Sequence, residues 1–220
     1  MTKSILTPFQ KNILDNLSKN DFITKNFWFS GGTALSEFYL QHRYSEDLDF
    51  FSNNEIPIEE VRAVVYPIFK EIGVESLEYR EILSSKIFFL KNNPRETVKA
   101  DFNFFPYERF GQEKKYHKLR VDGLMDIAIS KLDTILTRNK ARDFVDLYFI
   151  QKKHPYKIEF LLEKLEKRAM WKIDPIQLGS SFLKIKKLVD YPKMIKDFSK
   201  EEMIKYFEDL AAGLKDKIVK

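Results

Sequence analysis

The feature that most constrains the fold is an alternating run at residues 47–51, Asp-Leu-Asp-Phe-Phe. Side chains along a strand point alternately to opposite faces, so Leu48 and Phe50 are expected to pack into a core while Asp47 and Asp49 share the other face. Two carboxylates on one strand face can together bind a divalent cation such as Mg²⁺. The run therefore predicts a half-buried strand that presents two metal-binding side chains.

A glycine pair precedes this strand by about one helix length. The aromatic run Phe27-Trp28-Phe29 predicts a buried strand that ends at Gly31-Gly32. A helix is expected to follow as far as about Gln41, with Thr33 near its N-cap. Backbone N–H groups at a glycine turn that opens a helix can hold phosphate. This segment is thus predicted to be a strand, glycine turn and helix that bind an anion.

A second alternating run lies at residues 98–104. Val98 and Phe102 share one parity, whereas Lys99 and Asp101 share the other, so a third aspartate is expected on the polar face of a strand. The remaining elements predicted in this half are helices at 8–18 and 57–72, strands at 75–82 and 85–91, and a turn near 92–94.

After Gly111 the apolar spacing becomes helical and stays so to the end of the chain. It predicts helices at 123–137, 141–152, 157–169, 174–188 and 200–214. We therefore expect an α+β protein. An α/β lobe with a mixed or antiparallel sheet would occupy residues 1–118, and a helical lobe would occupy residues 119–220.

Composition limits the class of protein. The chain is 44% hydrophobic and 15% aromatic, which excludes extensive disorder and supplies a substantial core, in which Trp28 and Trp171 are expected. It has no signal-like segment and no apolar run of membrane-spanning length, so we expect a soluble, cytoplasmic protein. Because cysteine is absent, disulfides, thiol catalysis and cysteine zinc sites are excluded. Any metal must be bound by oxygen or imidazole.

The net charge of +5 is unevenly distributed. Residues 1–150 contain 21 Lys+Arg and 22 Asp+Glu, whereas residues 151–220 contain 17 and 11. Lysine-rich helices are often only solvated surface, but a basic lobe can also attract a polyanion such as RNA. Lys114, Lys115 and the carboxyl-terminal lysines are open to both interpretations.

The acidic strands and the glycine turn together suggest nucleotidyl transfer, in which catalysis consists largely of positioning and of charge neutralisation by metal ions. Asp47 and Asp49 would bind two Mg²⁺ or Mn²⁺ ions, and Asp101 would complete the ion that activates the acceptor hydroxyl. Ser45 and the backbone of Gly31-Gly32 would contact the triphosphate. Each element alone is more often a surface strand or a simple turn, but their combination between residues 31 and 101 favours a site.

Several polar residues near these motifs have less specific patterns. Arg43 could contact phosphate or bind Glu46. His42, His117 and His154 lack a mutual metal-ligand spacing, so no metal role is expected for them.

Two segments carry a family resemblance. Gly-Gly-Thr-Ala-Leu at 31–35, followed by His-Arg-Tyr-Ser-Glu-Asp-Leu-Asp-Phe-Phe at 42–51, resembles the first motif of the AbiEii/AbiGii nucleotidyltransferases, in the DNA polymerase β-like superfamily. The segments 126–132 and 138–147 are similar to the helical Lys…Arg…Lys/Arg-Asp-x-x-Asp motif of that family. The Gly-Ser signature of the superfamily is Gly-Gly-Thr here, and beyond residue 150 we find no motif.

The resemblance implies a polymerase β-like fold and a Mg²⁺-dependent transfer of NMP from an NTP to a hydroxyl, with the 3′ end of tRNA as acceptor. It further implies a toxin of a toxin–antitoxin or phage-defence pair, whose antitoxin is a separate DNA-binding protein. The nucleotide-binding residues that it implies are Gly31, Gly32, Thr33, Arg43, Ser45, Lys131, Arg138 and Asp146.

In the second motif, Lys131 would neutralise triphosphate charge as a catalytic residue. Asp146 would orient Lys131 or Arg142, or touch the base or ribose. A structural alternative is that Asp143 and Asp146 form an interhelical ion-pair network with these cations.

Two other functions remain open. The acceptor could be a hydroxyl of a protein or of a small molecule such as an aminoglycoside, since one scaffold hosts many acceptors. The chain could also be a module that binds nucleotide without transfer.

Overall fold

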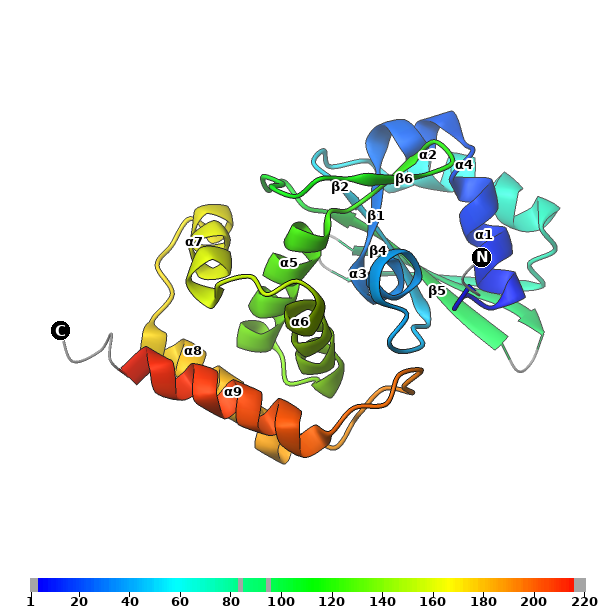
Figure 1. Cartoon of the computed structure of the whole chain (residues 1–220). Helices are drawn as coiled ribbons and strands as arrows, with labels where there is room; N and C mark the ends of the chain where they lie inside the picture. The colour runs from blue at the N-terminus through cyan, green and yellow to red at the C-terminus, as the bar shows by residue number, and fades with distance from the viewer. Residues whose placement is uncertain (1–3, 83–84, 94–95, 216–220) are drawn as a thin grey trace. The chain divides into compact units, whose positions relative to one another are not determined.

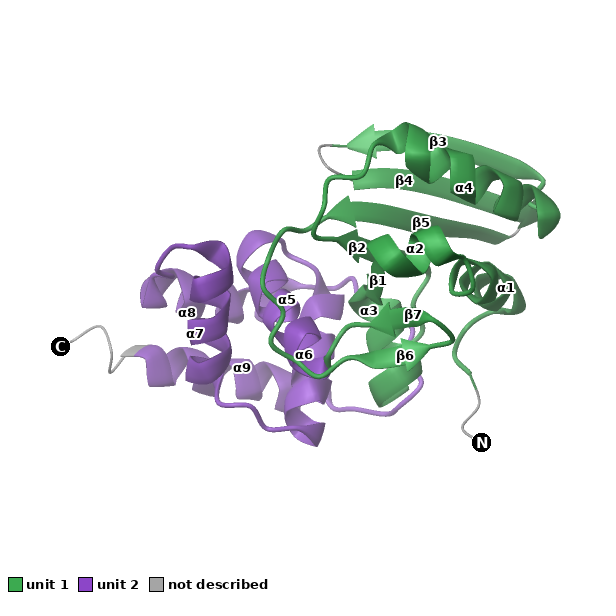
Figure 2. Ribbon diagram, turned by 90° about the horizontal axis from the view of Figure 1, so that it is seen from above, with its two compact units in different colours: residues 1–123 green, residues 124–220 purple. Residues whose placement is uncertain are grey.

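The computed structural model describes residues 4–82, 85–93 and 96–215. The chain forms two compact units, residues 1–123 and 124–220 (Figure 2). We had expected residues 119–123 in the helical lobe, whereas the strand at 119–121 pairs within the sheet of the first unit. The predicted turn at 92–94 lies partly outside the described residues.

The first unit is built on a mixed sheet (Figure 1), in which the strand order is β3-β4-β5-β2-β1-β7-β6 (Figure 2). Strands β2 and β5 run parallel, as do β1 and β7, and the other neighbours are antiparallel. This arrangement confirms the expected α+β class with a mixed sheet. The bounds are β1 Trp28–Ser30, β2 Asp47–Ser52, β3 Ser76–Ile82, β4 Ser85–Asn93, β5 Glu96–Phe104, β6 Lys114–Tyr116 and β7 Leu119–Val121.

The helices of this unit are α1 Pro8–Leu17, α2 Asp21–Asn26, α3 Gly31–Leu35, the π-helical turn η1 Ser36–Leu40, and α4 Ile58–Glu71. Helix α1 begins with a capping box, in which Thr7 Oγ1 accepts from the Gln10 N–H and Gln10 Oε1 accepts from the Thr7 N–H. Helix α2 and strands β6 and β7 were not predicted, because three to six residues are too few to show a period.

Aromatic side chains form much of the core of this unit. The Phe50 and Phe102 rings stack with their centroids 4.9 Å apart, and Phe27 and Phe88 pack edge-on against Phe102 at 5.2 and 5.7 Å. Phe69 of α4 contacts Phe88, so this helix covers the apolar face of the sheet at β4. The core thus fixes β2 and β5 side by side.

The second unit is helical, as expected, with a core that includes Phe144, Phe182 and Phe207. Trp171 was expected in the core but is 65% exposed, because α7 ends at Met170 in a left-handed conformation and the chain leaves the helix there. The helices are α5 Leu124–Thr137, α6 Ala141–Lys153, α7 Ile158–Ala169, α8 Pro175–Leu183, the 3₁₀ turn η2 Lys184–Lys187, and α9 Lys200–Lys215.

Among the described residues, none of the helices combines the length and the apolar character needed to cross a membrane.

Replacement of Phe102 by alanine is expected to lower the free energy of unfolding of the full chain by about 3–5 kcal/mol. The ring is 1% exposed and touches three other aromatic rings, so its loss leaves a cavity at the β2–β5 pair. Urea unfolding followed by circular dichroism measures this change. Phe160→Ala, at a ring that is 37% exposed, serves as the control, and an equal loss in both variants would contradict the assignment.

Candidate active site

The register of two parallel strands brings the three predicted acids together. Asp49 of β2 lies opposite Asp101 of β5, and Asp47 lies opposite Lys99. Paired residues of neighbouring strands point to the same side of a sheet, so these four side chains share one face. Asp47 and Asp49 are half-buried, but Asp101 is only 7% exposed. Asp101 therefore shares the face of the two other acids, as its parity predicts, but is nearly buried there.

The glycine pair packs directly against this acidic face. Gly31 has a positive φ of 77°, and a Cβ atom built there would overlap the Asp49 carboxylate, with Asp49 Cγ at 2.8 Å. A Cβ atom on Gly32 would overlap the Arg43 guanidinium and lie 3.1 Å from Ser45 Oγ. Only glycine permits both the backbone conformation and the close approach. Five of the predicted site residues therefore meet at this turn.

Thr33 is not the N-cap of the helix after the glycine pair. Its hydroxyl donates to the backbone carbonyl of Asp47, so Thr33 ties α3 to β2. The N-cap of α3 is Ser30, whose side chain makes no capping hydrogen bond. The prediction of an N-cap near Thr33 was wrong because the helix begins at Gly31 itself. Ser30 Oγ instead donates to Asp122 Oδ2 at 2.8 Å.

The loop before β2 is held by buried side chains. Gln10 Nε2 donates to the carbonyls of Ser45 and Glu46 at 2.8 and 3.0 Å, and Arg43 Nη1 donates to the Tyr44 carbonyl at 2.8 Å. Gln10 and Arg43 are each 3% exposed. These contacts fix Ser45 and Arg43 beside the glycine pair.

Lys99 is a member of this site that sequence reasoning did not assign. Its ammonium binds the Asp101 carboxylate. Burial alone would lower the pKa of Lys99, but the hydrogen bond to Asp101 and the charges of Asp101, Asp47 and Asp49 raise it. The sequence shows that Lys99 and Asp101 lie on the same face of a strand, but it does not show that the two side chains form an ion pair.

The pKa of Asp101 is raised, first by burial and then by the charge of Asp47, while Lys99 acts in the opposite direction. Oδ1 of Asp101 is buried and has no hydrogen-bond partner among the described residues. A buried, unpaired carboxylate oxygen is costly, so this atom calls for a donor or a cation. Asp101 Oδ1 is therefore a candidate ligand atom for a cation.

The donor set fits a hard divalent cation. Aspartate oxygens on rigid strands are preferred ligands of Mg²⁺ and Mn²⁺. Within residues 4–82, 85–93 and 96–215, however, no three carboxylates or imidazoles are already grouped as ligands of one ion.

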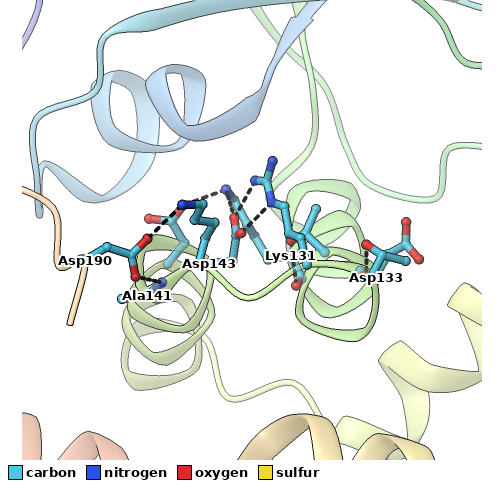
Figure 3. Close-up of polar contacts among 10 residues, drawn as sticks. Lys131, Asp133, Ala141, Asp143 and Asp190 are labelled. Atoms are coloured by element: carbon cyan, nitrogen blue, oxygen red, sulfur yellow. Dashed lines mark hydrogen bonds and ion pairs between the residues drawn. The ribbon is translucent and has the colours of Figure 1, made fainter. Parts of the chain in front are cut away.

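A second cluster of charges lies in the helical unit, between α5 and α6 (Figure 3). Lys131 Nζ is 3.0 Å from Asp143 Oδ1 and 2.7 Å from Asp146 Oδ2. Arg138 donates to Asp143 through Nε at 2.7 Å and Nη2 at 2.9 Å. The structural alternative for the two aspartates, an interhelical ion-pair network, is thus present within this unit, and it brings together Lys131, Arg138 and Asp146.

Burial in this network is nearly complete. The side chains of Asp143 and Asp146 are fully buried and that of Lys131 is 7% exposed, whereas Arg138 is 43% exposed. Burial would raise the pKa of Asp143, but Lys131 and Arg138 outweigh it and lower that pKa. Asp143 therefore stays ionised and holds both cations.

Another buried ion pair was not predicted. Asp126, within the second motif, accepts from Arg168 Nη2 of α7 at 2.9 Å, and Arg168 Nη1 donates to Ser130 Oγ at 3.1 Å. The partners are 42 residues apart, so no local pattern could indicate the pair.

Solved structures with this fold define the class. JHP933 from Helicobacter pylori superposes with a TM-score of 0.59 at 21% identity, covering 94% of this chain and 89% of that chain. A second H. pylori structure, of a candidate nucleotidyltransferase, gives a TM-score of 0.60 at 22% identity, covering 94% and 92%. The fold is that of the nucleotidyltransferases.

The chain belongs to the AbiEii family, described as the nucleotidyl transferase AbiEii toxin of a type IV toxin–antitoxin system, which matches residues 12–213. An uncharacterized protein of Aquifex aeolicus is 30% identical over 201 residues, which are 89% of this chain and 88% of that protein. The expected family is thereby confirmed, and the protein is a nucleotidyltransferase.

Replacement of Asp143 by asparagine is expected to destabilise the protein by about 3–5 kcal/mol, because it leaves the buried Lys131 ammonium with one carboxylate fewer. The folded-state pKa of Asp143 lies below its unfolded value, so its ionised form contributes stability that is complete above about pH 4 and is lost as the pH falls further. Urea unfolding curves recorded from pH 3 to pH 7, in steps of about one pH unit, measure both effects.

The control for Asp143→Asn is Asp209→Asn on α9, whose side chain is not fully buried. Asp143→Asn should lack part of the acid-dependent loss seen in the control. Equal stability of the two variants at pH 7 would overturn the role of Asp143.

Proposed function

We propose that this enzyme transfers NMP from an NTP to an RNA hydroxyl, at the 3′ end of tRNA, with Mg²⁺ or Mn²⁺ as cofactor. The observation that carries the proposal is the register of β2 and β5, with Asp101 opposite Asp49 and Gly31 packed against the Asp49 carboxylate. Carboxylates next to a glycine turn can serve a metal-bound triphosphate. Membership in a type IV toxin family supports action as a toxin, with an antitoxin as partner.

In this proposal the first unit holds the nucleotide. Asp47, Asp49 and Asp101 would bind the divalent cation, which when bound neutralises charge on the phosphates and activates the acceptor hydroxyl. Gly31, Gly32, Thr33, Arg43 and Ser45 would bind the triphosphate. The hydroxyl oxygen forms the new bond to the α-phosphorus as the bond to pyrophosphate breaks.

Residues of the second motif would bind triphosphate charge. We assign Lys131 and Arg138 to this role and Asp146 to the orientation of Lys131. The 2.7 Å contact of Asp146 with Lys131 Nζ supports the orienting role. Arg138 is the more accessible cation, because its side chain is 43% exposed against 7% for Lys131.

The RNA acceptor is supported by charge. The excess of base lies in residues 151–220, with 17 Lys+Arg against 11 Asp+Glu, and such a surface attracts a polyanion. Transfer to a protein or to a small-molecule hydroxyl is the alternative. Membership in a transferase family argues against a module that only binds nucleotide.

Incubation with each α-labelled NTP, Mg²⁺ and total RNA is expected to label RNA of tRNA size and to release pyrophosphate. Asp47→Asn should lower the rate by about a thousandfold, since loss of a metal ligand removes several kcal/mol of transition-state stabilisation. Glu46→Gln is the matched control, because it removes the same charge one residue away, on the opposite parity. Undiminished incorporation of label by Asp47→Asn would contradict the assignment of Asp47 as a metal ligand.

Label found in the protein or small-molecule fraction, with none in RNA, would show that the acceptor is a protein or small-molecule hydroxyl and not RNA.

Lys131→Ala should also lower the rate of transfer. Circular dichroism verifies that the helical unit of this variant remains folded.

Lys99→Gln is expected to bind Mn²⁺ about thirtyfold more tightly than wild type, because a unit charge about 4 Å from a divalent ion in water contributes about 2 kcal/mol of repulsion. The measurement is the free Mn²⁺ signal in electron paramagnetic resonance, without nucleotide. Lys91→Gln, at an exposed lysine on β4, is the control. Unchanged or weaker Mn²⁺ binding by Lys99→Gln would show that this ammonium does not compete with the cation.

A further inference from the structure

The end of strand β7 places a further acid beside the candidate site. Ser30 of β1 lies opposite Asp49 of β2 in their antiparallel register, and β7 runs parallel to β1 on its other side. The Asp122 N–H, one residue beyond β7, donates to the Phe29 carbonyl at 2.9 Å and so continues the ladder between β1 and β7. Ser30 therefore has Asp49 as its neighbour on one side and Asp122 on the other.

The side chains of Ser30 and Asp122 meet almost out of contact with water. Ser30 is 4% exposed and Asp122 is 5% exposed, and Ser30 Oγ donates to Asp122 Oδ2 at 2.8 Å. A hydrogen bond to a carboxylate is stronger than one between neutral groups, and burial strengthens it further. This contact therefore fixes the residue from which the Gly31-Gly32 turn begins.

Asp122 also holds the far end of the segment that follows the turn. Its backbone carbonyl accepts from the hydroxyl of Tyr39, a residue of η1, at 2.8 Å. Lys114 of β6 adds contacts there, because its Nζ donates to the Phe38 carbonyl at 2.7 Å and lies 4.1 Å from the centre of the Tyr39 ring. Asp122 thus contacts the segment formed by α3 and η1 both at its start and near its end.

Helix α3 depends on such outside contacts for its orientation. It has only five residues, η1 after it is a π-helical turn, and Ser30 makes no capping hydrogen bond with any described residue. So short a helix is not stable by itself. The Gly31 backbone is packed so closely that a Cβ atom there would lie 2.8 Å from Asp49 Cγ. A small shift of Ser30 would therefore displace the N–H groups of the glycine turn relative to the acids.

We propose that Asp122 is a positioning residue for nucleotide binding, an inference that rests on the proposed function, in which the glycine turn binds the triphosphate. The Asp122 carboxylate holds Ser30, and Ser30 holds the Gly31-Gly32 amides in place for phosphate oxygens. Preorganised N–H groups bind an anion more tightly than mobile ones, because less conformational entropy is lost on binding. Asp122 acts through Ser30 and does not touch the nucleotide.

The sign of the effect distinguishes positioning from simple electrostatics. A carboxylate repels a triphosphate, so a variant that loses only this charge should bind the nucleotide more tightly. A variant that loses the contact with Ser30 should bind it more weakly. Asp122→Ala loses both the charge and the contact, whereas Asp122→Asn loses the charge but keeps an amide oxygen that can accept from Ser30.

The test titrates the full chain with the α,β-methylene analogue of each common NTP and Mg²⁺ by calorimetry, so that no acceptor is needed. Wild type is expected to bind at least one analogue. Asp122→Ala and Ser30→Ala should each bind that analogue about tenfold more weakly, the worth of one hydrogen bond to a charged group. Asp122→Asn should bind it at least as tightly as wild type does.

Two further variants separate this role from a general loss of stability. Ser30→Ala combined with Asp122→Ala should bind the analogue no more weakly than Asp122→Ala alone, because the two residues act through one hydrogen bond. Ser18→Ala is the matched control, since Ser18 is a fully buried serine of the same unit whose hydroxyl donates to the Asp15 carbonyl at 2.9 Å. Ser18→Ala should bind the analogue as wild type does, and thermal unfolding compares the stability that each variant loses.

Several results would overturn the positioning role. They are an additive loss of about a hundredfold in the double variant, unchanged binding by Ser30→Ala, equal weakening by Ser18→Ala, and binding by Asp122→Asn as weak as that by Asp122→Ala. Absence of binding to every analogue by wild type would also overturn it. The expected pattern of binding, together with no label in RNA in the separate transfer assay, would leave this role standing and overturn the proposed RNA acceptor.

Discussion

The parallel pairing of β2 with β5 is the constraint on which the rest of the first unit depends. It places Asp101 opposite Asp49, and the stacked Phe50 and Phe102 rings on the opposite face hold the pair together. The same register that buries the aromatic core therefore gathers negative charge on the other side of the sheet. Lys99 offsets part of that charge, and the glycine pair lets α3 begin against the carboxylates. The pairing of β2 with β5 thus positions the aromatic core on one face of the sheet and the candidate site on the other.

The helical unit also places charged side chains of opposite sign close together, but there they are buried between helices. Lys131 is almost fully buried and is balanced by Asp143 and Asp146, while Arg138 shares Asp143 and remains partly exposed. A buried cation between two carboxylates is costly to break but adds little to stability compared with apolar packing. Such a network fixes the orientation of its members. It is therefore compatible with a catalytic motif as well as with a structural one.

Local patterns allowed much of this to be predicted from the sequence. The period of two identified β2 and β5 and placed Asp47, Asp49 and Asp101 on polar parities, because side-chain alternation is a property of the strand alone. The contacts of Thr33 and the exposure of Trp171 depend on where the chain turns, which spacing does not reveal. Lys99 was visible by parity, but its pairing with Asp101 required the structure.

The Lys99 ammonium is a permanent positive charge beside the Asp101 carboxylate. A side chain is tethered to its strand and cannot diffuse away, so its charge remains among the acids whatever ions the surroundings supply. The positive charge beside Asp101 is therefore supplied by the fold itself and does not have to be recruited from solution.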